Sequence, residues 1–241
     1  YVNGGAMKSF RDLIILDDMN LVLACDSAAG IGEKPCDEVF ADIEMVSYYA
    51  AFVPIAELLC VRSVPMVLVD TLCNEIEPYG EKIIRGIKMA MKDAGLDEGD
   101  GFTGSTEENF VTKMTGVGVT VLGRGLDIRK AQKGDAIYAI GKALVGEELI
   151  KYRDKAMSMS DYIYLKEQDY IHDIVPIGSK GAAHELAEIE AHAGLKARIV
   201  NDDFDLNASG GPSAMCLVTM KPDDFNKLNL KKDANLLAFM E

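Results

Sequence analysis

Basic residues are few in this chain. Its 241 residues include 25 Lys and Arg against 39 Asp and Glu, which gives a formal net charge of -14 at pH 7. A surface of this charge repels nucleic acids and anionic membranes, so we expect neither as a partner. The carboxylate excess fits a protein that gathers oxygen ligands around divalent cations, and equally one whose acidity only keeps it soluble.

Closely spaced cysteines are also lacking. The chain has no C-x-x-C pair. Most of its five cysteines lie in apolar runs; the five are Cys25, Cys36, Cys60, Cys73 and Cys216. We therefore expect neither a zinc site nor a disulfide framework. Reduced, buried thiols in a cytoplasmic protein are the simplest interpretation.

Long hydrophobic runs and targeting signals are absent as well. No apolar stretch is long enough to span a bilayer, and no signal peptide opens the chain. Residues 1–6 (YVNGGA) precede Met7 and are interpreted as a remnant of the expression vector. About half of the residues are hydrophobic (49%), as expected for a globular protein.

Hydrophobic periodicity predicts an α+β protein. Expected strands lie at 13–16, 21–25, 65–72, 115–123, 136–140, 173–178, 196–200 and 214–220. Expected helices lie at 43–61, 78–94, 147–156, 179–193 and 222–228. Because the pattern changes near Gly146, we expect an N-terminal domain at 7–145 and a smaller C-terminal domain at 146–241.

A first candidate site follows the second predicted strand. Asp26 ends this strand and leads into a loop that contains Gly30, Gly32 and Lys34. Glycines let backbone amides approach phosphate oxygens, Lys34 would neutralise phosphate charge, and Asp26 would hold magnesium. A flexible loop with solvated charges explains the same residues, and the local pattern does not decide between the two.

Asp70 is a second candidate because it interrupts the apolar run PMVLVDTL. A buried carboxylate is costly unless it is paired or binds a cation. We favour cation binding over a structural pair with Arg62 or Arg85. Asn74 and Glu75 follow closely as possible companions.

Two polar segments add candidates of lower specificity. Thr103-Gly104-Ser105-Thr106-Glu107-Glu108-Asn109 offers hydroxyls and amides to phosphate and a carboxylate to magnesium, although by itself it is typical of a surface turn. Gly178-Ser179-Lys180-Gly181 opens a predicted helix, whose N-terminus attracts anions, while an ordinary N-cap is an equal alternative. His172 is an acid-base candidate, and 209–213 (SGGPS) is more typical of a plain loop.

The order of these motifs resembles the aminoimidazole ribonucleotide (AIR) synthetase superfamily, which also includes thiamine monophosphate kinase, selenophosphate synthetase and the hydrogenase maturation dehydratase. The resemblance covers residues 13–140 well, and extends more weakly to GSKG and SGGPS. The synthetase patterns D-G-V-G-T-K and G-G-E-T-A-E are altered here. The forms C-D-S-A-A-G-I-G-E-K and T-G-S-T-E-E-N are closer to the synthetase-related proteins that include alpha-ribazole kinase.

The resemblance implies an AIR synthetase-like fold, with an N-terminal mixed sheet packed with helices and a smaller α/β C-terminal domain. It implies a homodimer that binds ATP near the sheet interface, and a kinase acting on alpha-ribazole with magnesium. The implied magnesium ligands are Asp26, Asp70 and Glu107. The implied cofactor-binding residues are Gly30, Gly32, Lys34, Thr103, Gly104, Ser105, Thr106, Ser179 and Lys180. The expected catalytic residues are Asp26, Lys34 and His172, with either Asp26 or His172 as an optional base for the acceptor hydroxyl.

Two alternatives to the kinase remain open. One is an ATP-dependent cyclo-ligase that activates an amide or carbonyl oxygen. The other is a regulator that binds nucleotide without turnover, since binding and catalytic glycine loops look alike in sequence.

Overall fold

A computed structural model of the chain describes residues 7–97, 99 and 101–241, so the predicted vector remnant at 1–6 lies outside the described residues. The chain forms two compact units. The first contains the chain up to Leu58 together with Ser63–Leu126, and the second contains Leu59–Arg62 and Asp127–Glu241. The division comes earlier than the boundary expected after residue 145, because 136–141 forms an inner strand of the second unit's sheet.

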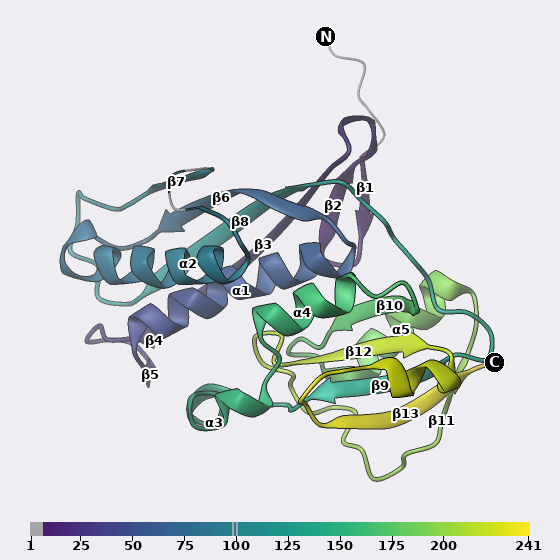
Figure 1. The fold of residues 1–241 in the computed structure, drawn as a ribbon. Helices are drawn as coiled ribbons and strands as arrows, with labels where there is room; N and C mark the ends of the chain where they lie inside the picture. The colour runs from purple at the N-terminus through teal and green to yellow at the C-terminus, as the bar shows by residue number, and fades with distance from the viewer. Residues whose placement is uncertain (1–6, 98, 100) are drawn as a thin grey trace. The chain divides into compact units, whose positions relative to one another are not determined.

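The first unit is built on a six-stranded sheet in the order β1-β2-β3-β8-β6-β7 (Figure 1). Its strands are β1 (Met7–Phe10), β2 (Leu13–Leu16), β3 (Leu21–Ala29), β6 (Val64–Leu72), β7 (Phe102–Ser105) and β8 (Gly116–Arg124). Only β6 and β7 pair in parallel, so the sheet is mixed, as predicted. A short ribbon of β4 (Ile31–Gly32) and β5 (Val39–Phe40) projects after β3.

Two helices lie along one face of this sheet, α1 (Ile43–Cys60) and α2 (Glu81–Asp93) (Figure 1). The side chain of Asp42 accepts a hydrogen bond from the Glu44 amide and caps α1. By length and composition α1 could cross a membrane, which the sequence analysis did not anticipate. However, 67% of its apolar window is buried inside the protein, as in an ordinary core helix.

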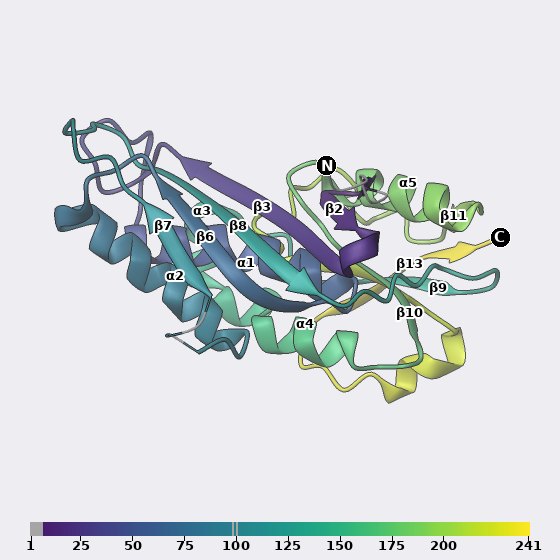
Figure 2. The ribbon, with the colours of Figure 1, turned by 90° about the horizontal axis from the view of Figure 1, so that it is seen from above.

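The other face of the sheet carries no helix of the first unit in the described residues; Figure 2 looks down on this face. Leu23 and Val69 lie on it half-exposed, whereas Val22, Leu68 and Val121 on the helix side are fully buried. Alternate residues of a strand point to opposite faces, so this contrast defines a buried and an open side.

The second unit contains a five-stranded antiparallel sheet in the order β10-β12-β9-β13-β11. Its strands are β9 (Ala136–Gly141), β10 (Ile171–Pro176), β11 (Ala197–Ile199), β12 (Met215–Met220) and β13 (Ala234–Met240). Its helices are α3 (Gly146–Lys151), α4 (Met159–Lys166) and α5 (Gly181–Ala193). Every residue of β9 and β12 is buried, so both faces of the sheet's centre are covered.

Candidate functional site

Strand register aligns the two predicted aspartates. Asp26 on β3 pairs with Val119 on β8, and Val119 also pairs with Asp70 on β6. Asp70 pairs in turn with Gly104 on β7. Directly paired residues share a sheet face, so the two carboxylates lie in one row on the helix side, separated by a single strand.

Asp70 is the most perturbed carboxylate of this row. Its side chain is 2% exposed, and its Oδ2 atom has no hydrogen-bond partner among the described residues. Burial raises the pKa of Asp70 to about 6, although the Ser105 amide, which donates a hydrogen bond to it, acts in the opposite direction. An unsatisfied buried oxygen of this kind is costly and is typical of a group whose partner is a ligand or an ion.

Gly104 is the residue that makes room for this carboxylate. A Cβ atom at position 104 would overlap the Asp70 carboxyl group. The glycine in T-G-S-T is therefore required by the close approach of a side chain, not by an unusual backbone angle.

We expect Gly104→Ala to push the Asp70 carboxylate out of its position. If Asp70 holds the nucleotide's metal, ATP turnover should fall at least about ten-fold. The control is Gly99→Ala, because an added Cβ at Gly99 meets no atom within 4 Å. Equal turnover in the two variants would show that the position of the Asp70 carboxylate does not matter. Steady-state assays and thermal melts of both variants make this comparison.

Asp26 lies in a milder environment within β3, which continues to Ala29, so Asp26 does not end this strand as the sequence predicted. Its side chain is half-buried, and burial raises its pKa. The Ser27 amide lowers this pKa and the nearby charge of Asp12 raises it. Asp26 is therefore a carboxylate that takes up a proton more readily than a free one.

A cleft of about 460 Å³ opens at the carboxyl ends of β6 and β7. Its walls are Thr71, Leu72, Cys73, Ser105, Thr106, Glu107, Phe110 and Thr112. Ligands in sheets with parallel strands bind at the carboxyl ends of those strands, and this cleft lies at the carboxyl end of the only parallel pair in the sheet.

The predicted phosphate and metal residues divide between two places. Thr103 and Ser105 are exposed and alternate with Gly104, so they point away from the face that carries Asp26 and Asp70. Glu107 lines the cleft, and its Oε1 accepts the Asn109 amide. In the described part of the chain, no three His, Cys, Asp or Glu side chains come together as a metal-binding group, so the expected trio does not form a preassembled cluster.

Lys34 is engaged within the protein. Its side chain is fully buried, and its ammonium group donates to both Glu75 carboxylate oxygens at 2.7 Å and to the Thr112 carbonyl and hydroxyl at 2.8 Å. The ammonium also lies 4.7 Å from the centre of the Tyr79 ring. An ammonium has three hydrogens, and these acceptors engage them, so Lys34 forms an internal ion pair. The phosphate role of Lys34 stays a prediction.

The Glu75 carboxylate responds to this pairing. Desolvation raises its pKa, but the hydrogen bonds and charge of Lys34 and nearby backbone amides outweigh that effect and hold the pKa at about 2. Glu75 is thus an ionised partner of Lys34 and not the companion of Asp70 that the sequence suggested.

Asn74 and Asp37 extend the same network to two neighbouring loops. Asn74 is fully buried; its amide donates to Thr112 and to the Met114 carbonyl, and its Oδ1 accepts the Gly116 amide. Asp37 accepts from both the amide and the hydroxyl of Thr115 at 2.7 Å. These contacts fix segments 30–42 and 106–116 beside the cleft. Sequence reasoning missed the role of Asp37, because nothing local marks its partner.

Gly30 and Gly32 belong to this loop architecture. Gly30 has φ +71, and its amide donates to the Thr115 carbonyl. A Cβ at Gly32 would overlap the hydroxyl of Thr115 and approach Asp37. Gly30 is explained by its positive φ, and Gly32 by the close approach of the Thr115 and Asp37 side chains.

In the second unit the two predicted glycine segments meet. The Gly210 amide donates to the Gly178 carbonyl at 3.0 Å, and Gly210 and Gly211 have no space for a Cβ against the Ile177 and Leu144 carbonyls. Ser179 and Lys180 are exposed just before α5, which begins at Gly181 rather than at 179. This cluster lies where β9 and β10 end and β12 begins.

His172 lies at the opposite end of that sheet. It is the extra residue of a β-bulge at the start of β10, and its Nδ1 lies 2.7 Å from Oδ2 of the fully buried Asp135. Lys221 also pairs with Asp135, at 2.8 Å. The length of strand β10 separates His172 from Gly178, so these two predicted site elements are not brought together.

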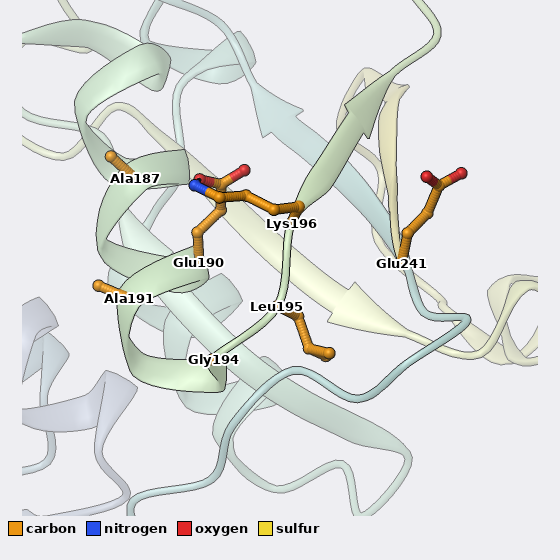
Figure 3. A pocket seen from close by; sticks show the side chains of 7 residues that line it. All are labelled: Ala187, Glu190, Ala191, Gly194, Leu195, Lys196 and Glu241. Carbon is orange, nitrogen blue, oxygen red and sulfur yellow. Dashed lines mark hydrogen bonds and ion pairs between the residues drawn. The ribbon is translucent and has the colours of Figure 1, made fainter.

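A shallow recess of about 520 Å³ in the second unit contains none of the predicted residues (Figure 3). It is lined by Ala187, Glu190, Ala191, Gly194, Leu195, Lys196 and Glu241. Its charged groups are used internally, since Glu190 accepts from the Ala197 amide at 2.8 Å and from Lys196 at 2.7 Å.

Comparison with solved structures identifies the fold. Thiamine monophosphate kinase from Aquifex aeolicus superposes with a TM-score of 0.66 at 15% identity, over 92% of this chain and 84% of that one. AaThiL complexed with AMPPCP and TMP gives 0.65 at 15% identity, over 98% and 84%. The chain has the AIR synthetase-like fold. The hydrogenase maturation protein HypE in complex with ATP gives 0.61 at 14% identity, over 91% and 76%.

Sequence comparison adds nothing to this likeness. No family model matches the chain. No curated protein matches it either. The predicted resemblance to the AIR synthetase superfamily is therefore confirmed at the level of the fold.

Proposed function

We propose that this chain is an ATP- and magnesium-dependent phosphotransferase acting on a small nucleoside-like acceptor, most specifically alpha-ribazole. The observation that carries the proposal is the combination of a cleft at the ends of β6 and β7 with an adjacent buried aspartate whose Oδ2 is unsatisfied. The fold is shared with AaThiL complexed with AMPPCP and TMP and with HypE in complex with ATP.

Magnesium fits the residues present. Asp70 offers an unpartnered oxygen, and Asp26 offers a second carboxylate in the same row. Magnesium at nucleotide sites is usually held by one or two carboxylates plus substrate phosphates, so a preassembled trio is not needed. When bound, the ion would neutralise phosphate charge. We assign Asp70 and Asp26 to hold it.

Phosphoryl transfer depends more on positioning and charge neutralisation than on covalent help from the protein. We assign the cleft residues Ser105 and Thr106 to orient the nucleotide through their hydroxyls. The Lys34–Glu75 network supports these residues by fixing the loop that follows them. We assign the Asp26 carboxylate oxygen that does not hold magnesium to accept the acceptor hydroxyl's proton.

Three further parts of the proposal concern the acceptor, assembly and location. We assign the joined glycine segments near Gly178 and Gly210 to the acceptor. The open sheet face that carries Leu23 and Val69 is suited to pairing with a second copy of the chain. None of the five cysteines forms a disulfide in the part of the chain that the structure describes, which fits a protein acting in the reducing cytoplasm.

The direct test is ADP release from ATP and magnesium by purified protein, with and without alpha-ribazole. The proposal predicts that ADP release depends on alpha-ribazole. ATP binding without acceptor-stimulated ADP release would reject alpha-ribazole as the acceptor. Tight ATP binding with no ADP release for any nucleoside-like acceptor would reject the phosphotransferase itself.

A further inference from the structure

An unusual group of cations surrounds Tyr152 in the second unit. The ammonium groups of Lys142, Lys151 and Lys155 lie 5.6, 5.0 and 5.4 Å from the centre of its ring. All three lysines are exposed, and Tyr152 is half-buried. Three positive charges therefore share one aromatic ring in a chain whose net charge is -14.

Some lysines of this unit have an acidic partner and others do not. Ion pairs with carboxylates engage Lys196, Lys221, Lys227 and Lys232. For the three lysines at Tyr152, no ion pair is found within the described residues, even though Asp154 is a close neighbour in sequence. Contact with an aromatic ring is a weak interaction at an exposed site, so it leaves the three ammonium groups available to an anion.

The chain separates its charges in this segment. Glu147 and Glu148 occupy the first turn of α3, where the helix dipole favours acids, and Lys151 occupies the last turn, where it favours cations. The acids flank the lysine group and limit its extent. A long polyanion such as nucleic acid would meet these acids, whereas a single phosphate group would not.

The lysine group adjoins the joined glycine segments. Lys142 directly follows β9, and Leu144, two residues on, presents its carbonyl to Gly211 so closely that a side chain there is excluded. The loop that carries Lys142 is thus packed on the loop that we assign to the acceptor.

We propose that Lys142, Lys151 and Lys155 around Tyr152 form a binding site for the phosphate group of a small molecule other than ATP. A phosphorylated product or acceptor of the proposed reaction has this chemistry. That assignment of the source rests on the proposed function, whereas binding of the anion does not.

The test is calorimetric titration of the full chain with pyrophosphate at low salt. The triple variant Lys142→Gln, Lys151→Gln, Lys155→Gln should bind pyrophosphate at least about ten-fold more weakly, because several exposed charge interactions are lost together. The control is Lys133→Gln, which removes one exposed lysine beyond the other end of β9 and should leave binding unchanged. Raising the salt concentration should weaken binding in the wild type more than in the triple variant.

The same proteins are then titrated with ATP and magnesium. Unchanged ATP affinity in the triple variant supports a site for a different phosphate compound, and a loss equal to that for pyrophosphate would overturn it. Absence of pyrophosphate binding in the wild type, or an equal loss in Lys133→Gln, would also overturn the proposal. If lysine-dependent pyrophosphate binding is present but no acceptor is phosphorylated, the proposed function fails and the anion site stands.

Discussion

Asp70→Asn is expected to abolish ATP turnover and, at the same time, to make the metal-free protein more resistant to unfolding near pH 7. Asparagine keeps the shape of the side chain and can still accept the Ser105 amide. It removes the charge that would hold magnesium. We expect turnover to fall at least about a hundred-fold, as for the loss of a group that neutralises charge in phosphoryl transfer.

The stability change follows from the pKa of Asp70, which burial raises from 3.8 to about 6. The folded chain binds the Asp70 carboxyl proton more tightly than the unfolded chain does. The stability that this proton contributes is therefore present below pH 4 and is lost as the pH rises through 6. A shift of this size corresponds to roughly 3 kcal/mol. Asparagine does not ionise, so Asp70→Asn does not lose stability in this way as the pH rises.

Urea titrations in EDTA at pH 4 and pH 7 measure the effect. The difference in free energy of unfolding between Asp70→Asn and the wild type should grow in favour of the variant between these pH values. If the variant is inactive but this difference in free energy of unfolding is the same at both pH values, burial does not destabilise the Asp70 carboxylate. A variant with full turnover would remove Asp70 from the site.

Lys34→Met is expected to destabilise the first unit by about 3 kcal/mol, because it leaves the Glu75 carboxylate without its partner in a largely buried place. The double variant Lys34→Met, Glu75→Leu should recover most of this loss, since no unpaired charge remains. A double-mutant cycle in urea measures the coupling between the two residues.

The same variant separates the two roles considered for Lys34. An ion pair that only supports the loops predicts lower stability and nearly unchanged ATP affinity in the folded protein. Direct contact with phosphate predicts at least about a ten-fold loss of ATP affinity with a small change in stability. The second result would contradict the engagement of the ammonium by Glu75 and Thr112.

The sequence predicted those elements whose pattern is local. The apolar run at 65–72 and the long helix at 43–61 are found almost as expected, because hydrophobic periodicity specifies them. The sequence of 103–109 is typical of a surface turn, whereas Phe102–Ser105 forms strand β7 by pairing with β6 at the sheet edge. Helix α4 was missed, although its capping box at Ser158 and Asp161 is visible in the sequence.

The site was predictable only in part, for a related reason. Asp70 was a candidate site residue because it is costly to bury a carboxylate in an apolar run, and the structure confirms that Asp70 is buried. Its alignment with Asp26 depends on β8, which is inserted between them from much later in the chain. The Lys34–Glu75 pair joins residues 41 positions apart, so no local motif could distinguish this structural lysine from one that binds phosphate.

The fate of the γ-phosphoryl group of ATP tests the central claim most directly. Wild-type protein and Asp70→Asn would be incubated with ATP, magnesium and alpha-ribazole, and the products followed by phosphorus NMR. A phosphotransferase predicts that the wild type yields ADP and a phosphate monoester of alpha-ribazole, and that Asp70→Asn yields neither. ADP accompanied only by free inorganic phosphate, or a phosphate monoester formed equally well by Asp70→Asn, would contradict the account.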